Sequence, residues 1–115
     1  MDTPTAKASL TKSFDFSASH ASAGKILGYN YRLHVHFEGA PDENAVAAKI
    51  SSSLISKIHS HDLGEHVDFL KDVPLQGPEL VRAFWRVIER AVAPEDLRSL
   101  TLEQDSRTRW TLEAE

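Results

Sequence analysis

Apolar and polar residues alternate in two stretches of the first forty residues. From Phe14 to His20 the residues Phe, Phe, Ala and His share one parity, and Tyr29 to Glu38 shows the same period. A period of two places successive side chains on opposite faces, so each stretch is predicted to be a strand with one buried face. Ala23-Gly24 is predicted to form a turn or short loop between them, with a second flexible point at Gly28.

A helical period follows the second strand. Gly39 to Asn44 is rich in helix breakers and contains candidate N-cap residues. From Ala45 to Ile58 apolar residues recur every three or four positions, which predicts a helix. The serines at 51–53 are poor helix formers, so this helix is expected to depend on packing. A long connection over 59–76 comes next.

The last forty residues predict a second helix and a hairpin. Gly77-Pro78 suits the start of a helix, and this helix should end before Pro94. Ser99 to Gln104 and Thr108 to Glu113 alternate again, and Asp105-Ser106 lies between them as a predicted turn.

The predicted order is strand, strand, helix, helix, strand, strand. It indicates an α+β domain in which a four-stranded antiparallel sheet carries two helices on one face. The second face of the sheet is predicted to be polar, with the residues Arg32, His34, His36, Thr101, Glu103, Arg109 and Glu113. Such a face either meets water or lines the lumen of a barrel that other subunits close.

Composition limits the function classes. The chain has 115 residues, of which 41% are hydrophobic and 26% charged. We expect one domain over 13–115, after a flexible segment over 1–12. A net charge of -4 without a long basic run argues against a nucleic-acid partner. The chain has no cysteine, which excludes a disulfide and a thiolate nucleophile. No apolar stretch approaches the roughly 20 residues of a membrane span, so we expect a cytoplasmic protein without a membrane partner.

Five short segments carry a family resemblance. Phe14-Asp-Phe-Ser-Ala-Ser-His20 resembles the first strand of the 6-pyruvoyl tetrahydropterin synthase and 6-carboxytetrahydropterin synthase family, where the His binds zinc. Leu27 to Leu33 is similar to the His-Gly-His-Asn-Tyr strand start of that family. Val67 to Val73, Gly77 to Leu80 and Leu100 to Asp105 resemble three later segments in the same order. The resemblance runs from about residue 13 to the end. It implies the T-fold, in which subunit sheets join into a barrel, and a homohexamer of two stacked trimers.

The chain departs from this family at the residues that carry its chemistry. Of the three zinc-binding histidines only His20 is present, and Leu27 and Tyr29 occupy the other two positions. The catalytic cysteine is absent, and His59-Ser60 stands where the family has an Asp-His pair. One imidazole does not hold zinc, which needs three or four protein ligands. The resemblance therefore implies a diverged homolog with no zinc or other cofactor and without the synthase reaction.

The resemblance implies a partly retained pterin anchor. The family uses a third-strand Glu to accept hydrogen bonds from the pterin ring, and an ungapped match places Gln104 there. The alternation of side chains along the strand agrees with this match, because Leu100 and Leu102 share a face with Gln104. The rival anchor is Glu103, which needs a one-residue slip that would send both leucines to the polar face. The expected ligand-binding residues are Gln104, Glu79, His20, Tyr29, Glu103 and His61.

Other polar residues allow other interpretations. His34 and His36 are spaced either to share a metal or simply to form a polar face. Ser60-His61-Asp62 contains the residue types of a catalytic triad, although neighbours in sequence rarely form one because their side chains diverge. The remaining alternatives are a transition metal bound by His59, His61 and His66, and an anion bound by Arg107 and Arg109.

Three functions are consistent with the sequence. The first is a zinc-free protein that binds a pterin-like or purine-like ring. The second is a non-catalytic structural or interaction protein whose pocket is empty. The third is a metal-independent enzyme that uses His20, His61 and Asp62 on a pterin-like substrate.

Overall fold

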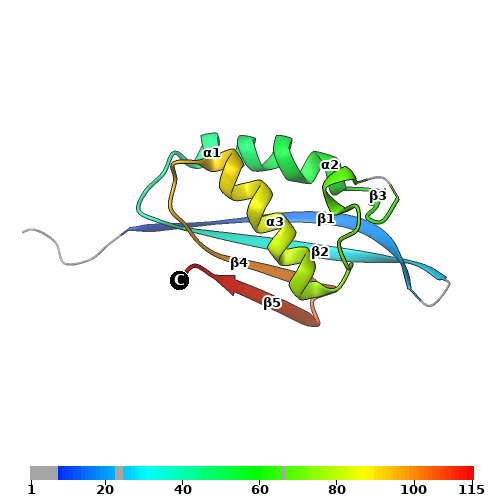
Figure 1. The fold of residues 1–115 in the computed structure, drawn as a ribbon. Coiled ribbons are helices and arrows are strands. Elements are labelled where there is room, and N and C mark those ends of the chain that lie inside the picture. Colours follow the sequence, from blue (N-terminus) through cyan, green and yellow to red (C-terminus); the bar gives the residue numbers. More distant parts are fainter. Residues whose placement is uncertain (1–7, 23–24, 66) are drawn as a thin grey trace, which may run out of the picture.

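The computed structural model describes residues 8–22, 25–65 and 67–115. In this part of the chain, one five-stranded sheet carries the helices on a single face (Figure 1). The strand order is β3-β1-β2-β4-β5. The strands are β1 (Ser9–Ser22), β2 (Lys25–Glu38), β3 (His61–Asp62), β4 (Leu97–Gln104) and β5 (Thr108–Glu113). The α-helices are α1 (Glu43–Ile50), α2 (Ser56–Ile58) and α3 (Gly77–Val92), and a 3-10 turn covers Asp68–Leu70. The predicted α+β class is confirmed, and the predicted elements occur in the predicted order, with β3 added between the helices.

The sheet has one strand more than predicted. β3 has only two residues, and it pairs parallel with Ala18 and Ser19 of β1. The long hairpin also extends beyond the alternating stretches, because β1 begins at Ser9 and β2 includes Gly28. β1 therefore contains residues 9–12 of the segment that was expected to be flexible. The predicted turn at Ala23-Gly24 lies outside the described residues.

The helix predicted over 45–58 is divided by a π-helical segment. α1 begins after Asp42, whose side chain accepts a hydrogen bond from the Ala45 backbone N–H at 3.0 Å. Ser51–Ile55 then forms π-helix before α2. The Ser53 hydroxyl donates to the Lys49 carbonyl at 2.6 Å. Serine side chains that bond to the preceding turn compete with regular helical geometry, which suits the irregular segment at the three serines.

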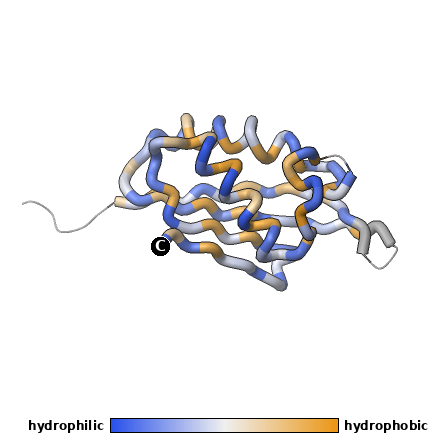
Figure 2. Tube along the Cα trace, in the orientation of Figure 1, coloured by the Kyte–Doolittle hydropathy of each residue, from blue (hydrophilic) through white to orange (hydrophobic). Residues whose placement is uncertain are grey.

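The core lies between the helices and one face of the sheet (Figure 2). Leu33, Val35 and Phe37 of β2 and Leu100 and Leu102 of β4 are fully buried. The predicted alternation is therefore confirmed for both strands. The helices contribute the buried side chains Val46, Ile50, Leu54, Ile58, Leu80, Phe84 and Ile88. No helix in the described ranges is both long and apolar enough to cross a membrane.

Candidate functional site

Aromatic rings form a row on the helix-covered face of β1 and β2. His20 stacks on Tyr29 with 5.1 Å between ring centroids and 25° between planes. Tyr29 lies 6.1 Å from Tyr31, which stacks on Phe16 at 4.9 Å. Two of the predicted site residues, His20 and Tyr29, are thus brought together. Tyr31 was not among the predicted site residues, since its place in the alternation indicates only a core residue.

Tyr29 and His61 line one hollow of about 300 Å³ at the β3 side of the sheet. The His61 Nδ1 lies 2.7 Å from the His59 carbonyl oxygen. Because a carbonyl only accepts, Nδ1 carries the hydrogen, and Nε2 of the neutral ring keeps its lone pair. His61 can therefore accept a hydrogen bond in this hollow. His20, Tyr29 and His61 form the part of the predicted site that the structure joins.

Gln104 lies beside Tyr31 in the pairing of β4 with β2. Its parity follows the buried Leu100 and Leu102, so Gln104 belongs to the helix-covered side and Glu103 to the other. Glu79 is in the first turn of α3. No hydrogen bond within the described part of the chain joins Gln104 or Glu79 to the residues that line the hollow at β3.

Three buried polar atoms have no hydrogen-bond partner in the part of the chain that the structure describes. They are His20 Nδ1, the Tyr31 hydroxyl and Glu79 Oε2. An unpartnered buried polar group costs on the order of 1–3 kcal/mol, so such a group calls for an explanation. Burial raises the pKa of the Tyr31 hydroxyl, and Tyr29 and Asp105 raise it further. Tyr31 therefore stays protonated and able to donate.

The residues that the sequence resemblance aligns with zinc ligands do not fit a metal. Leu27 pairs with His20 across the hairpin, and Tyr29 packs its ring against the imidazole. Leucine has no donor atom, and zinc sites use three or four protein ligands. Among the described residues, no group of three His, Cys, Asp or Glu side chains is arranged to hold a metal ion.

In the other predicted polar clusters, the side chains already have hydrogen-bond partners or one member lies outside the described residues. Both His34 ring nitrogens are engaged, and the His36 Nδ1 bonds to Thr11 at 2.9 Å. These two histidines therefore do not share a metal. Asp62 accepts from the backbone of Gly64 and from Glu65, and its other oxygen accepts from the Ser19 hydroxyl. Ser60-His61-Asp62 is thus not arranged as a triad. The third member of the His59, His61 and His66 cluster, His66, lies outside the described residues.

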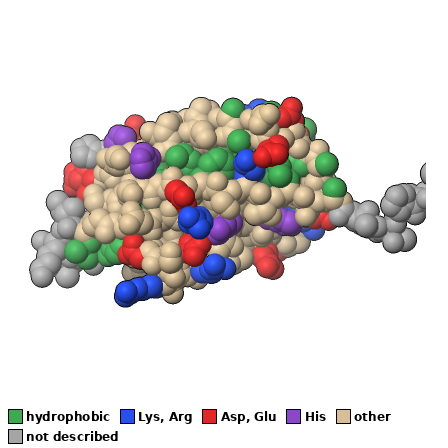
Figure 3. Space-filling model, turned by 180° about the vertical axis from the view of Figure 1, so that it is seen from behind, with side chains coloured by type: hydrophobic (Ala, Val, Ile, Leu, Met, Phe, Trp, Pro, Cys, Tyr) green, Lys and Arg blue, Asp and Glu red, His purple; other side chains and the backbone are tan. Residues whose placement is uncertain are grey.

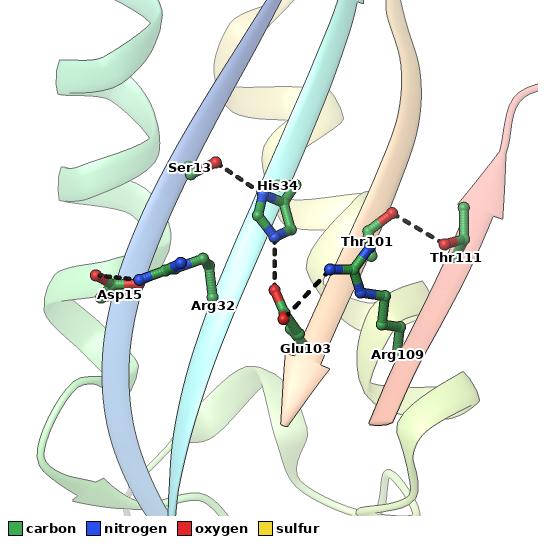
Figure 4. A network of polar contacts seen from close by, with 8 residues as sticks. All are labelled: Ser13, Asp15, Arg32, His34, Thr101, Glu103, Arg109 and Thr111. Carbon is green, nitrogen blue, oxygen red and sulfur yellow. Dashed lines mark hydrogen bonds and ion pairs between the residues drawn. The ribbon is translucent and has the colours of Figure 1, made fainter. Parts of the chain in front are cut away.

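The uncovered face of the sheet carries a polar network (Figure 4). The Glu103 carboxylate accepts from His34 Nε2 at 2.8 Å and from Arg109 at 3.4 Å, and its side chain is 12% exposed. Arg32 Nε donates to Asp15 at 2.6 Å. Figure 3 views this face, where acidic, basic and histidine side chains are mixed. Glu103, the rival anchor, is therefore engaged on the face opposite Gln104.

This network predicts a loss of stability in acid. The hydrogen bond from His34, followed by Arg109, holds the pKa of Glu103 below its ordinary value of 4.5. The hydrogen bond from Arg32 holds the pKa of Asp15 below 3.8. A lowered carboxyl pKa gives stability that is complete above the ordinary pKa and is lost as the pH falls through the lowered one.

We therefore expect the free energy of unfolding to fall as the pH drops below about 4.5. Urea unfolding between about pH 3 and pH 7 measures this slope. In the Asp15→Asn/Glu103→Gln variant the slope should be shallower over the same range. An unchanged slope would show that these two carboxylates are not responsible.

Comparison with known proteins identifies the fold. No family model matches the sequence, and no curated protein matches it. The structure is similar to that of 6-pyruvoyl tetrahydropterin synthase from Caenorhabditis elegans, with a TM-score of 0.81 and 17% sequence identity. The match covers 96% of this chain and 97% of that one. The chain therefore has the T-fold of 6-pyruvoyl tetrahydropterin synthase, as its sequence resemblance implied.

Proposed function

We propose that this protein binds a flat, amide-bearing heterocycle of pterin type, without zinc and without the synthase reaction of its structural relative. The observation that carries the proposal is the place of Gln104 beside Tyr31, whose buried hydroxyl has no partner in the described residues. A side-chain amide offers both a donor and an acceptor, and the hydroxyl adds another donor. Together they match the carbonyl oxygen and the neighbouring N–H on the amide edge of such a ring.

The charge state of the anchor sets the strength of binding. Gln104 is neutral, so its bond to the N–H groups of a ring lacks the charge assistance that a carboxylate gives. Affinity should therefore be lower than with a Glu at this position, by about 1 kcal/mol. Because Leu27 and Tyr29 supply no metal site for a ring substituent, small pterins should bind better than triphosphorylated ones.

The proposal places the ligand at an interface between subunits of a homo-oligomer, a hexamer of two stacked trimers. The relative's fold, the polar uncovered face and the open strand edges support this assembly. Closing sheets from several subunits into a barrel would pair those edges. If light scattering shows a monomer at micromolar concentration, the proposed binding site between subunits is wrong.

Calorimetry with an unsubstituted pterin tests the anchor. We expect Gln104→Ala to weaken binding about tenfold, which corresponds to loss of one hydrogen bond of about 1.4 kcal/mol. Gln104→Glu should strengthen it, since the carboxylate adds charge assistance.

Glu103→Ala is the matched control, because Glu103 is the next residue on the same strand and faces the other way. Its affinity should equal that of the unmodified protein. If Glu103→Ala alone weakens binding, the anchor is wrongly assigned. If the unmodified protein binds no pterin at millimolar concentration, the hypothesis of a non-catalytic interaction protein is favoured instead.

A further inference from the structure

A larger hollow opens on the uncovered face of the sheet. Its volume is about 460 Å³, and residues of β1, β2 and β4 form its floor, among them Asp15, Arg32 and Glu103. His59 lines it at the end of α2, and Asp105 lines it at the turn between β4 and β5. We call it the open-face hollow.

The first free donor of this hollow is His59. The backbone N–H of Ser17 donates to His59 Nδ1 at 3.1 Å. Since the donor there is the backbone, Nδ1 carries no hydrogen, and the hydrogen of the neutral ring is on Nε2. Within the described residues Nε2 has no hydrogen-bond partner, so His59 presents an N–H. This is the opposite tautomer to that of His61.

Two more donors come from β2. The side-chain oxygen of Asn30 accepts from the Ser17 hydroxyl at 2.8 Å, which leaves the amide NH₂ without a partner in the described part of the chain. Arg32 uses Nε and Nη2 on Asp15, at 2.6 and 3.4 Å, and keeps Nη1. Among the described residues, three donors in this hollow thus have no partner, one at the C-cap of α2 and two on β2.

The carboxylates of the hollow are mostly engaged. Asp15 is paired with Arg32, and Glu103 with His34 and Arg109. Asp105 is the exception, because one oxygen accepts from the Asn30 backbone N–H at 2.8 Å and the other has no partner in the residues described.

The Asp105 carboxylate is held firmly at the rim. Asp105 and Ser106 have φ values of 51° and 59°, and the Arg107 N–H bonds to the Gln104 carbonyl at 3.0 Å. This is the geometry of a type I′ hairpin turn. The Asp105 N–H also donates to the Asn30 carbonyl at 2.7 Å, which ties the turn to β2.

We propose that the open-face hollow binds a neutral small molecule that carries an amide or ureide group. The carbonyl oxygen would accept from two of the three donors of His59, Asn30 and Arg32, and the N–H would donate to Asp105. A carboxylic acid fits less well, because its charge would face Asp105 and it has no N–H to give. The charged floor residues and Gln104 are on opposite faces of the sheet, although Tyr31 of the pterin proposal also lines this hollow.

Nuclear magnetic resonance of the ¹⁵N-labelled protein can test this with fragments that bind weakly. The chain has two asparagines, Asn30 and Asn44, and Asn44 lies exposed at the start of α1. Titration with acetamide should move the Asn30 side-chain amide resonances saturably and leave those of Asn44 in place. Titration with sodium acetate should move neither. Equal movement at both asparagines, or a larger response to acetate, would overturn the proposal.

Asp105→Asn tests the acceptor. Asparagine tolerates a positive φ and keeps an oxygen for the Asn30 N–H, so the turn should persist. We expect acetamide to bind about fivefold more weakly and acetate to begin to bind. Asp72→Asn is the matched control, because Asp72 is also exposed and has a φ of 65°.

A Gln104→Ala variant should titrate with acetamide like the unmodified protein. This result separates the hollow from the pterin site, so either proposal can fail alone. If Asp105→Asn changes the response to neither fragment, Asp105 is not the acceptor and the assignment of the hollow is wrong.

Discussion

Replacing Gly77 with alanine is expected to lower the free energy of unfolding by about 3 kcal/mol. A Cβ atom at Gly77 would lie 2.0 Å from Cε2 and 2.1 Å from Cδ2 of Trp110. The indole packs against the core, so it has to move as a whole. Helix propensity acts in the opposite direction, because alanine is favoured over glycine by about 1 kcal/mol inside a helix. The steric overlap is the larger effect and decides the sign.

Chemical denaturation followed by circular dichroism measures this change. Gly28→Ala is the matched control, since a Cβ there would meet nothing within 4 Å. It should change stability by less than about 0.5 kcal/mol. Trp110→Leu in the Gly77→Ala background should recover part of the loss by removing the overlapping ring. A Gly77→Ala protein as stable as the unmodified one would contradict the close packing of α3 on β5.

Phe84→Ala is expected to be more destabilising still, by about 4 kcal/mol. Phe84 is fully buried on α3. Its ring meets Phe16 of β1 edge to face at 6.1 Å and Phe69 at 6.3 Å. Removing it opens a cavity where the helix, the sheet and the connection before α3 meet, and three elements lose contacts at once.

The same denaturation experiment tests Phe84. Arg86→Ala, two residues along the same helix and exposed, is the control and should change stability by less than about 0.5 kcal/mol. A loss below about 1 kcal/mol for Phe84→Ala would mean that the surrounding side chains close the cavity, and the core would then be less rigid than its packing indicates.

The elements with strong periodicity could be predicted from the sequence, and those without it could not. The alternation of Tyr29 to Glu38 fixes which side of β2 is buried, and the apolar pattern before Pro94 marks α3. His61–Asp62 is too short to show any period, so β3 was missed. The first residues of β1 were missed because Ser9 and Thr11 are polar. They are held by backbone pairing with Glu38 and His36 rather than by burial.

Some features of the candidate site could likewise be predicted from the sequence, and others could not. Strand parity separates Gln104 from Glu103, because a period of two needs only the sequence. The stack of His20 on Tyr29 follows from the register of the hairpin, which the composition does not reveal. The tautomers of His59 and His61 depend on which backbone group each ring meets. No residue pattern carries that information.

The short length of β3 has a consequence for assembly. β3 covers only Ala18 and Ser19, so the first part of β1 is one open edge of the sheet and β5 is the other. These edges belong to different strands, and a contact that joins β5 of one copy to β1 of the next is heterologous. A row of copies joined in this way always has a free β1 edge at one end and a free β5 edge at the other. The addition of copies therefore stops only when the rotation between neighbours closes a ring. Otherwise the assembly grows into a filament.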